Sequence, residues 1–436
     1  MNTFKLIAAC MALCLLSFQA VAQDEPEKPA APAGDWVEIT LDDGTPFGFG
    51  SLLQAGDGLW GADYDRTSYG WLLHNLHDGK SEPVKLKGGE LFRADLNRFW
   101  RVAGHAFVAS AVDPKNPKAS PGLYLLEGAV ATSIKTPDDD LFMAEPQAEA
   151  LLTDSNYLGL SSREGHACYR YDGKLTRVKF PVDNPRFRAF LADGDRLFCS
   201  WPLGVWMYDG KKWTELKDED GDPLWGPRRF SQVAGDYLCE PSDESIGTLY
   251  VLQGDVLRRV TFNDDLYARD LCAFGDRVLV TITKLGVPQV VAMVEFTKKG
   301  AVTFKPYAEV AQRQTVRIWG DGNVGMLIAY DGRNYSYYRL NADGIAPFKF
   351  AEDQPLGWIG NAVTLKDRLV ATMRSGGWNT PWQLVSIDKD GNVGAARDKQ
   401  GNPVSGSELR LGQDSSGIYV TSTKGETPHT WYLPVK

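Results

Sequence analysis

Short apolar stretches alternate with polar turns along almost the whole chain, and this pattern predicts β-strands throughout. Residues 192–216, ADGDRLFCSWPLGVWMYDGKKWTEL, show it most clearly. They contain four short strands separated by a Gly-Asp turn, a short loop and an Asp-Gly turn. Aromatic and branched residues dominate the strands, as a pleated and half-buried surface favours. No stretch has the spacing of a long amphipathic helix.

The same four-strand unit recurs about nine times. Its first turn lies at Gly56, Gly104, Ser155, Gly194, Gly235, Gly275, Gly322, Lys366 and Ser415, at spacings of 39 to 51 residues. Four short strands at such a period are typical of β-propeller blades, of which a ring has about four to eight. The sequence therefore predicts an all-β fold, a single closed β-propeller of eight or nine four-stranded blades.

The two ends of the chain predict how the ring closes. The last unit stops after its third strand, TWYLPV (430–435). At the other end, WVEITLDDGTPFG (36–48) aligns with WTELKDEDGDPLWG (213–226), the fourth strand of the clearest unit and the loop after it. We therefore expect the N-terminal strand to complete the C-terminal blade, which would leave no raw sheet edge there.

The first 34 residues have the features of a targeting segment and a tether. Residues 1–22 combine Lys5, the apolar run 6–18 and the small residues 20–22, which predicts a signal peptide. Residues 23–34 are charged and rich in Pro and Ala, which predicts a disordered tether. Residues 35–436 would then form the propeller domain of a secreted or periplasmic protein. We expect no membrane span after signal removal, because no later segment is apolar for long enough.

Charge and motifs narrow the classes of function. Lys and Arg number 47 against 56 Asp and Glu, a net charge of −9, and the basic residues are dispersed. We therefore expect no nucleic-acid partner. The chain has no Gly-x-Ser-x-Gly, phosphate-loop or HExxH motif. His74 and His77 are three apart on a predicted strand and would point to opposite faces, so we predict no metal site there.

We predict no cofactor, with calcium as the alternative at one acidic run. DEDGD (218–222) begins like a calcium-binding loop, but Pro223 stands where such a loop needs Gly. An acidic turn between strands is the simpler interpretation of this run.

One segment resembles a known repeat. GVWMYDGKKWTEL (204–216) is similar to the repeat of the two-component-regulator propeller family. Those repeats occur in extracytoplasmic sensor regions of bacterial receptors. The resemblance therefore implies a propeller fold and a place outside the cytoplasm.

Four cysteines follow the predicted signal peptide, at 168, 199, 239 and 272. Cys199 and Cys239 lie at nearly equivalent positions on predicted second strands of neighbouring units. An oxidising compartment would allow them to form a disulfide. The alternative is that they are small apolar residues packed between blades.

The functional face should be the end of the ring that carries the loops between second and third strands, which we call the connection face. The blade-to-blade connections belong to the same end if strand direction alternates. The first class of loop supplies Trp201, Trp378 and Trp382, and the second supplies Asp218, Asp220 and Asp222. We predict a binding site of aromatic side chains ringed by acids. The opposite end holds only tight hairpins.

These features favour an extracytoplasmic, non-catalytic recognition or scaffold protein that binds a protein or a glycan on one propeller face. The alternative is a carbohydrate-active hydrolase or lyase with acidic residues at the central channel, since acids abound. A broad exposed aromatic patch would favour binding. A buried carboxylate pair with perturbed pKa values would favour catalysis. The sequence leaves the ligand and the oligomeric state open.

Overall fold

The computed structural model describes part of the chain. It covers residues 35–434 apart from 41–46, 67–69, 112–121, 136–148, 153, 163–164, 183–186, 188, 202–203, 225–231, 241–247, 261–266, 284–288, 297–301, 311–314, 322–323, 331–334, 342–343, 351–357, 366–367, 375–379 and 423–427. Every named element in this described part is a β-strand, which confirms the predicted all-β class. No helix in it is long and apolar enough to cross a membrane. The predicted signal peptide (1–22) and tether (23–34) lie outside it.

Six sheets each contain an antiparallel meander of four strands in chain order. The first three comprise β11 (Glu149–Leu152), β13 (Tyr157–Ser162), β14 (Gly165–Tyr171) and β15 (Leu175–Arg177); β16 (Ala189–Asp193), β17 (Arg196–Trp201), β18 (Gly204–Tyr208) and β19 (Trp213–Glu215); and β20 (Gln232–Ala234), β21 (Tyr237–Glu240), β22 (Thr248–Gln253) and β23 (Val256–Arg259).

The other three continue the series. They comprise β24 (Tyr267–Phe274), β25 (Arg277–Thr283), β26 (Gln289–Phe296) and β27 (Val302–Val310); β28 (Thr315–Asp321), β29 (Val324–Tyr330), β30 (Tyr335–Asn341) and β31 (Gly344–Pro347); and β32 (Trp358–Leu365), β33 (Arg368–Arg374), β34 (Trp382–Ile387) and β35 (Val393–Ala395), with β36 (Ser405–Gly406) paired to β34.

One larger sheet of ten strands holds two further meanders. These are β2 (Ser51–Ala55), β3 (Gly58–Asp65), β4 (Gly70–His77) and β5 (Lys80–Pro83), then β7 (Arg93–Val102), β8 (His105–Ser110), β9 (Leu123–Glu127) and β10 (Val130–Ile134). They form one sheet because β4 pairs with β7, where Trp71 lies opposite Ala94. Two short strands add to it, β6 (Lys85–Leu86) beside β10 and β12 (Asp154–Ser155) beside β7.

The last sheet joins the two ends of the described chain. It contains β37 (Leu409–Gln413), β38 (Gly417–Ser422), β39 (Thr430–Pro434) and the N-terminal β1 (Val37–Glu38). Val37 lies opposite Tyr432 and Glu38 opposite Trp431, in antiparallel register. The N-terminal strand thus completes the C-terminal meander, as the alignment of 36–48 with 213–226 predicts. The described residues hold nine four-stranded meanders, which matches the number of sequence repeats.

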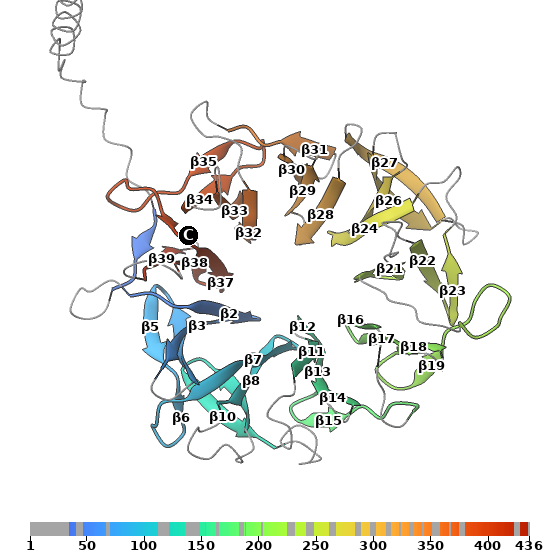
Figure 1. Ribbon diagram of the computed structural model, residues 1–436, viewed down its shortest axis with the longest axis horizontal. Helices are drawn as coiled ribbons and strands as arrows, with labels where there is room; N and C mark the ends of the chain where they lie inside the picture. Colours follow the sequence, from blue (N-terminus) through green and yellow to red (C-terminus); the bar gives the residue numbers. More distant parts are fainter. Residues whose placement is uncertain are drawn as a thin grey trace, which may run out of the picture.

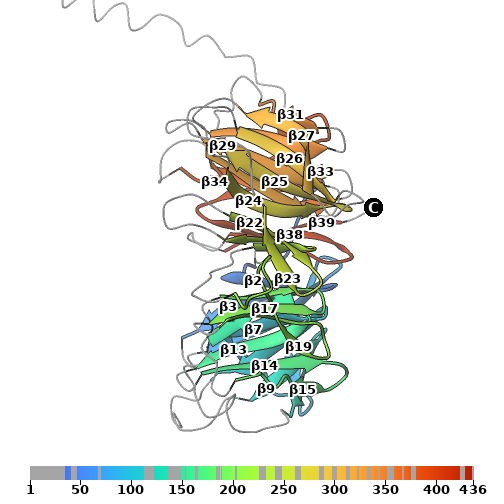
Figure 2. The ribbon, with the colours of Figure 1, turned by 90° about the vertical axis from the view of Figure 1, so that its right-hand side faces the viewer.

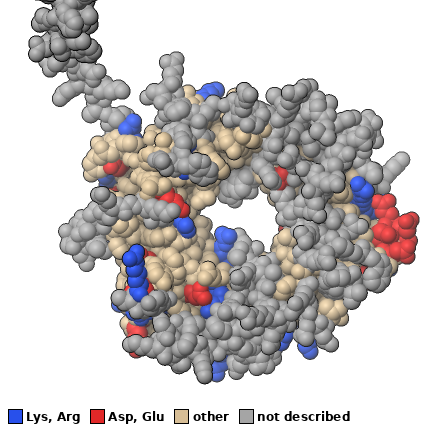
Figure 3. Space-filling model, viewed as in Figure 1, with Lys and Arg blue, Asp and Glu red and all other residues tan. Residues whose placement is uncertain are grey.

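The sheets stand in chain order around a central opening, with the last sheet beside the first (Figure 1). Seen from the side, the strands cross the thickness of the ring (Figure 2). The space-filling view leaves the opening clear at its centre (Figure 3).

Apolar packing joins each meander to the next. The described residues form nine hydrophobic clusters, and each contains side chains from two neighbouring meanders. The cluster between the last and first meanders includes Phe49, Leu59 and Leu76 from one side and Tyr419 from the other. Burial of such side chains is the main favourable term in folding, so the sheets stabilise one another through their faces.

Hydrogen bonds add to the contact between the last and first meanders. The Phe49 amide donates to the hydroxyl of Thr421 over 3.0 Å, and that hydroxyl lies 3.1 Å from the Phe49 carbonyl oxygen. The Gln413 amide donates to the side-chain oxygen of Gln54, 3.1 Å away. Residues more than 350 positions apart in the sequence are therefore held side by side.

The repeated glycine of the first turn has a steric reason at Gly56. Its φ of +52° is a conformation that side chains other than glycine's rarely adopt. A Cβ added there would also lie 2.4 Å from the carbonyl oxygen of Gly104, the corresponding turn of the next meander. The first turns of the first two meanders therefore approach each other closely.

We expect Trp36→Ala to lower the free energy of unfolding by about 3–5 kcal/mol, the usual cost of removing a buried tryptophan. Trp36 is 5% exposed and packs with Val370 and Leu384 of the preceding sheet. Denaturant unfolding measures the effect. Trp358→Ala is the matched control, because Trp358 is 45% exposed and should cost far less. Equal losses for the two variants would contradict the structural role of the N-terminal strand.

Candidate functional site

A groove of about 660 Å³ opens at the ends of three neighbouring inner strands. Its lining comes from β32, β33 and β34, from the start of β37 and from β2, and comprises Leu52, Gly360, Asn361, Thr372, Arg374, Trp382, Ser407, Glu408, Leu409, Arg410 and Leu411. β33 ends and β34 begins beside the groove, so the groove lies on the connection face. Its volume falls within the range of small-ligand sites, about 300–1,000 Å³.

Trp382 and Arg374 form a fixed pair in the groove. Arg374 is the last residue of β33, and Trp382 is the first residue of β34. The guanidinium carbon of Arg374 lies 4.9 Å from the centre of the indole ring. Such cation–π contacts favour a defined stacking geometry. One face of Trp382 is therefore covered by Arg374.

Gly360 makes room for this pair. A Cβ at Gly360 would lie 2.7 Å from the hydroxyl oxygen of Thr372 and 2.9 Å from Cζ3 of Trp382. β32 carries an irregularity between Ile359 and Ala362, and the Asn361 amide there donates to the Thr372 hydroxyl over 3.0 Å. The bulged backbone and the missing side chain together let Trp382 lie against β32.

Charged and polar groups line the other side of the groove. The Arg410 guanidinium donates to the Ser51 hydroxyl over 3.1 Å and lies 3.6 Å from the Glu408 carboxylate. The Arg410 side chain is 44% exposed. An exposed pair at that separation is a weak one. The groove thus carries two arginines and one glutamate among its lining residues.

An aromatic platform lies beside the groove on the same face, formed by Tyr330, Tyr335 and Trp358. The rings of Tyr330 and Tyr335 stack at 4.6 Å, and those of Tyr335 and Trp358 at 5.9 Å. Trp358 is 45% exposed, the largest fraction among the exposed large hydrophobic residues of the described chain. Trp358 is opposite Arg374 in the β32–β33 register, so the platform and the groove meet at the end of one sheet.

The structure separates the site residues that the sequence groups together. Trp382 lines the groove. Trp378 lies outside the described residues. Trp201 ends β17, on a sheet across the ring from β34, and its side chain is not among those described.

The acidic residues Asp218, Asp220 and Asp222 lie elsewhere, at the outer edge of the ring. Lys217 pairs with Val256 at the start of β23, and its amide donates to the Asp255 carbonyl oxygen over 2.9 Å. The loop after β19 therefore lies against the hairpin turn of the next sheet (Figure 1), where Figure 3 shows acidic side chains. The expectation that these acids share a site with the Trp382 loop needs correction. A sheet twists from its inner to its outer strand, so the fourth strand ends beside the neighbour's hairpin.

Asp218 also has a structural task. One of its carboxylate oxygens accepts the backbone N–H groups of Asp220 and Asp222, each over 3.0 Å. Asp388 and Asp398 close loops in the same way, accepting amides two and four residues ahead. Side-chain and backbone hydrogen bonds from Asn392 lower the pKa of Asp388. Acidic loops of this repeat are thus turns held by the first Asp.

Binding of a metal ion would need side chains that can together hold it. Among the described residues, no three His, Cys, Asp or Glu side chains lie together in a way that could hold a metal ion.

The cysteines occupy packed positions. Cys199 is a free thiol in a hydrophobic cluster with Cys168, Tyr157 and Leu197, between two neighbouring sheets. Burial raises the pKa of both thiols. Cys239 lies in β21, and its side chain is not among those described. The Cys199–Cys239 disulfide stays a prediction, while the packing of Cys199 agrees with the alternative of an apolar residue between blades.

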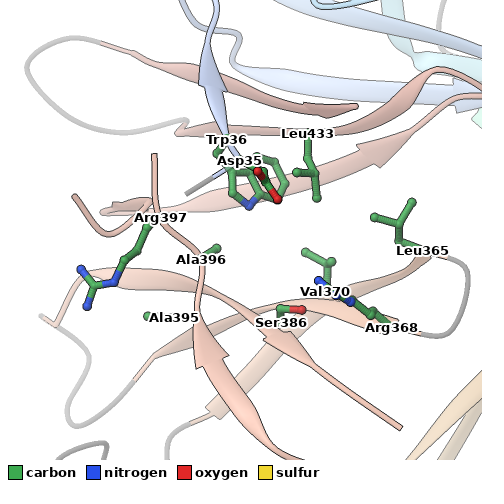
Figure 4. A pocket seen from close by; sticks show the side chains of 10 residues that line it. All are labelled: Asp35, Trp36, Leu365, Arg368, Val370, Ser386, Ala395, Ala396, Arg397 and Leu433. Atoms are coloured by element: carbon green, nitrogen blue, oxygen red, sulfur yellow. The ribbon is translucent and has the colours of Figure 1, made fainter. Parts of the chain in front are cut away.

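A second cavity of about 310 Å³ lies where the N-terminal strand packs on the sheet of β32–β35 (Figure 4). Trp36 and Leu433 lie on one side of it, and Val370 and Ser386 on the other. The guanidinium of Arg397 points away.

This second cavity follows from a small residue at Ala396. Its amide donates to the Leu384 carbonyl oxygen, just as the amides of Leu216 and Phe348 donate to the third strands of their own meanders. Ala396 therefore stands where these other meanders have a large apolar side chain. The cavity is the space beside Trp36 that a larger side chain at position 396 would fill. The groove is therefore the stronger candidate site.

Comparison with known proteins finds distant similarity to solved structures only. No protein-family model and no curated protein matches the chain. Similar solved structures include the computationally designed Ika8 protein, with 10% identity, coverage of 77% of this chain and 96% of that one, and a TM-score of 0.41. The N-terminal domain of Nup159 is 8% identical, with coverage of 64% and 87% and a TM-score of 0.31.

Prolyl oligopeptidase B from Galerina marginata is 11% identical, with coverage of 75% of this chain and 55% of that one and a TM-score of 0.40. The fold is all-β and β-propeller-like. Similarity at this level carries no argument about what the protein binds. The resemblance of residues 204–216 to the two-component-regulator repeat stays a hypothesis.

Sequence reasoning missed the platform and both arginines of the groove. Trp358 was one of 13 tryptophans, most of which suit packing between blades. The signal for it was its place at the very start of a strand, directly after a connection. The adjoining tyrosine-rich strand YSYYRL (335–340) was a second signal.

We expect Gly360→Ala to destabilise the protein by about 1–3 kcal/mol, because the added methyl overpacks against Thr372 and Trp382. Gly394→Ala on β35 of the same sheet is the matched control, since a Cβ there meets no atom within 4 Å. Thermal unfolding of the two variants measures the difference. If both variants melt together with the wild type, the close packing of Trp382 on Gly360 is wrong.

We expect Cys168 and Cys199 to resist alkylation at pH 8 in the native protein and to react after unfolding, because burial keeps both thiols protonated and shielded. Iodoacetamide labelling followed by mass spectrometry measures the two rates. A peptide pair linking Cys199 to Cys239 under non-reducing conditions would contradict the free thiol and support the sequence-based disulfide.

Proposed function

We propose that the protein is a closed nine-bladed β-propeller outside the cytoplasm that acts as a non-catalytic recognition module. Its ligand is a glycan chain, bound on the connection face by the aromatic platform and the groove. Secretion or periplasmic location rests on the signal-peptide pattern of residues 1–22, which lie outside the described residues.

Contacts between every pair of neighbouring meanders support the closed ring. Each of the nine hydrophobic clusters belongs to a different neighbouring pair, and one of them joins the last meander to the first. The pairing of β1 with β39 supports it further, because the two ends of the described chain share one sheet.

The observation that carries the binding proposal is the row of stacked rings at Tyr330, Tyr335 and Trp358, which ends in the exposed ring of Trp358 beside two half-buried tyrosines. Trp358, at 45% exposure, adjoins two further aromatic rings, so the exposed surface is part of an aromatic group rather than a single scattered side chain. Flat aromatic faces suit the apolar faces of sugar rings, while the Asn361 amide and the Ser407 hydroxyl in the groove suit sugar hydroxyls. A glycan uses both features at once.

The catalytic alternative needs a pair of carboxyl groups, one of them with a raised pKa. Among the described carboxyl groups, those with resolved shifts are Asp209 and Asp388, and both pKa values are lowered. The backbone N–H groups of Lys212 and Lys211 lower that of Asp209. Neither group is suited to act as a general acid. The hydrolase or lyase proposal therefore ranks second, and assays for sugar release would test it.

We expect Trp358→Ala to weaken glycan binding by about 2 kcal/mol or more, as for a central aromatic contact, with little change in melting temperature. Tyr64→Ala is the control, because Tyr64 is a similarly exposed aromatic residue on the first meander, at 43%. A glycan array, then calorimetry on the best ligand, measures both. Equal binding by the wild type and Trp358→Ala, or binding of polypeptides alone, would refute the proposal.

A further inference from the structure

We infer that the glycan recognised on this face carries carboxylate groups, with a sugar ring on Trp358 and a carboxylate held by Arg374 and Arg410. This inference rests on the proposed function and adds the chemical class of the ligand.

Arg374 is positioned for this task by Trp382. Stacking on the indole ring holds the guanidinium in a set plane, 4.9 Å from the ring centre. Gly360 allows the ring to lie that close to β32. A guanidinium stacked by its face keeps its N–H groups at the edge of the plane, which is the geometry that a carboxylate matches.

Arg410 brings the second positive charge to the groove. Arg410 is the second residue of β37. Its guanidinium donates to the hydroxyl of Ser51, the first residue of β2, over 3.1 Å. Its 3.6 Å separation from the half-buried Glu408 carboxylate is longer than a hydrogen bond. A ligand carboxylate could therefore replace Glu408 as its partner at small cost.

Local charge in the groove has the opposite sign from the whole chain. The chain carries a net charge of −9, whereas the groove has two arginines against one glutamate. An acidic protein repels anionic polymers at long range. A basic groove in such a protein therefore selects anionic groups that come close enough to pair with the guanidinium groups.

The aromatic platform favours a carboxylated glycan over an acidic polypeptide as the ligand. Trp358 and Arg374 face each other in the register of β32 and β33, so an aromatic surface and a guanidinium lie one strand apart. A uronic acid presents a ring face and a carboxylate within a single sugar residue, so one sugar residue offers a group to each. An acidic peptide would use the arginines and leave the platform without a partner.

The test compares ligands that differ only in charge. Oligosaccharides of galacturonate, mannuronate and guluronate are measured by calorimetry beside their neutral methyl esters, with poly-glutamate as the acidic polypeptide. We expect at least one acid form to bind about tenfold tighter than its ester, and higher salt to weaken only the acid form.

Four variants locate the effect. Arg374→Gln and Arg410→Gln should each reduce the preference for the acid form by about tenfold. Glu408→Gln should increase affinity for the acid form several-fold, because it removes a competing carboxylate. Arg368→Gln, on the same strand β33 but lining the second cavity, should change nothing. Arg410→Gln decides the matter if the Arg374 variant fails to fold.

The outcomes separate the inference from the function beneath it. Equal binding of acid and ester, lost in Trp358→Ala, would overturn the carboxylate inference and support the glycan-binding function. Arginine-dependent binding of poly-glutamate without binding of any oligosaccharide would overturn both. No binding of any oligosaccharide at millimolar concentration would also overturn the inference.

Discussion

Packing between neighbouring sheets is the interaction on which the rest of this structure depends. A four-stranded meander has two faces and cannot bury them alone, so each must cover its neighbour. The last meander meets the first through residues far apart in sequence, as at Phe49 and Thr421. The N-terminal strand also joins the two chain ends, because β1 pairs with β39 and Trp36 packs on the sheet of β32–β35. Pairing of the chain ends covers the edge of β39, and apolar packing covers the faces of the last meander.

The same packing determines where a site can form. Apolar side chains fill most of the space between meanders, and the first turns of the first two meanders approach each other closely at Gly56 and Gly104. Space remains where strands begin and end on the connection face. There the bulge at Gly360 and the missing side chain open a groove between sheets, and Trp358 projects at its edge. Rigid strands therefore hold Arg374, Trp382 and Trp358 in place, while the loops can vary without moving them.

The repeat and the sheet shared by the two chain ends were predictable from the sequence because they depend on local patterns. Turn residues at regular spacing give the nine meanders, and the match of Trp36 with Trp213 gives the shared last sheet. The joining of β4 to β7 into one large sheet was not predictable, since it depends on how two strand edges meet in space. Trp382 was found because its Gly-rich surroundings mark a loop.

The rest of the site was hidden for physical reasons. Exposure separates Trp358 from a buried residue such as Trp100, and exposure depends on the neighbouring sheet rather than on local sequence. The role of Asp218 cannot be read from the sequence, because an acidic run has the same residues whether its carboxylates bind a ligand or accept hydrogen bonds from backbone amides. In the structure Asp218 accepts such hydrogen bonds. The twist of the outer strand then carries that loop to the outer edge of the ring. A sequence alone does not show the role of a residue where three-dimensional neighbours decide it.

Hydrogen–deuterium exchange with and without a carboxylated oligosaccharide tests the central claim, recognition on the connection face, most directly. The account predicts slower exchange in the peptides that cover 358–361, 372–374 and 405–411, with no change in the loop 218–222. Protection confined to the hairpin turns or to 218–222, with the platform and the groove unaffected, would contradict it.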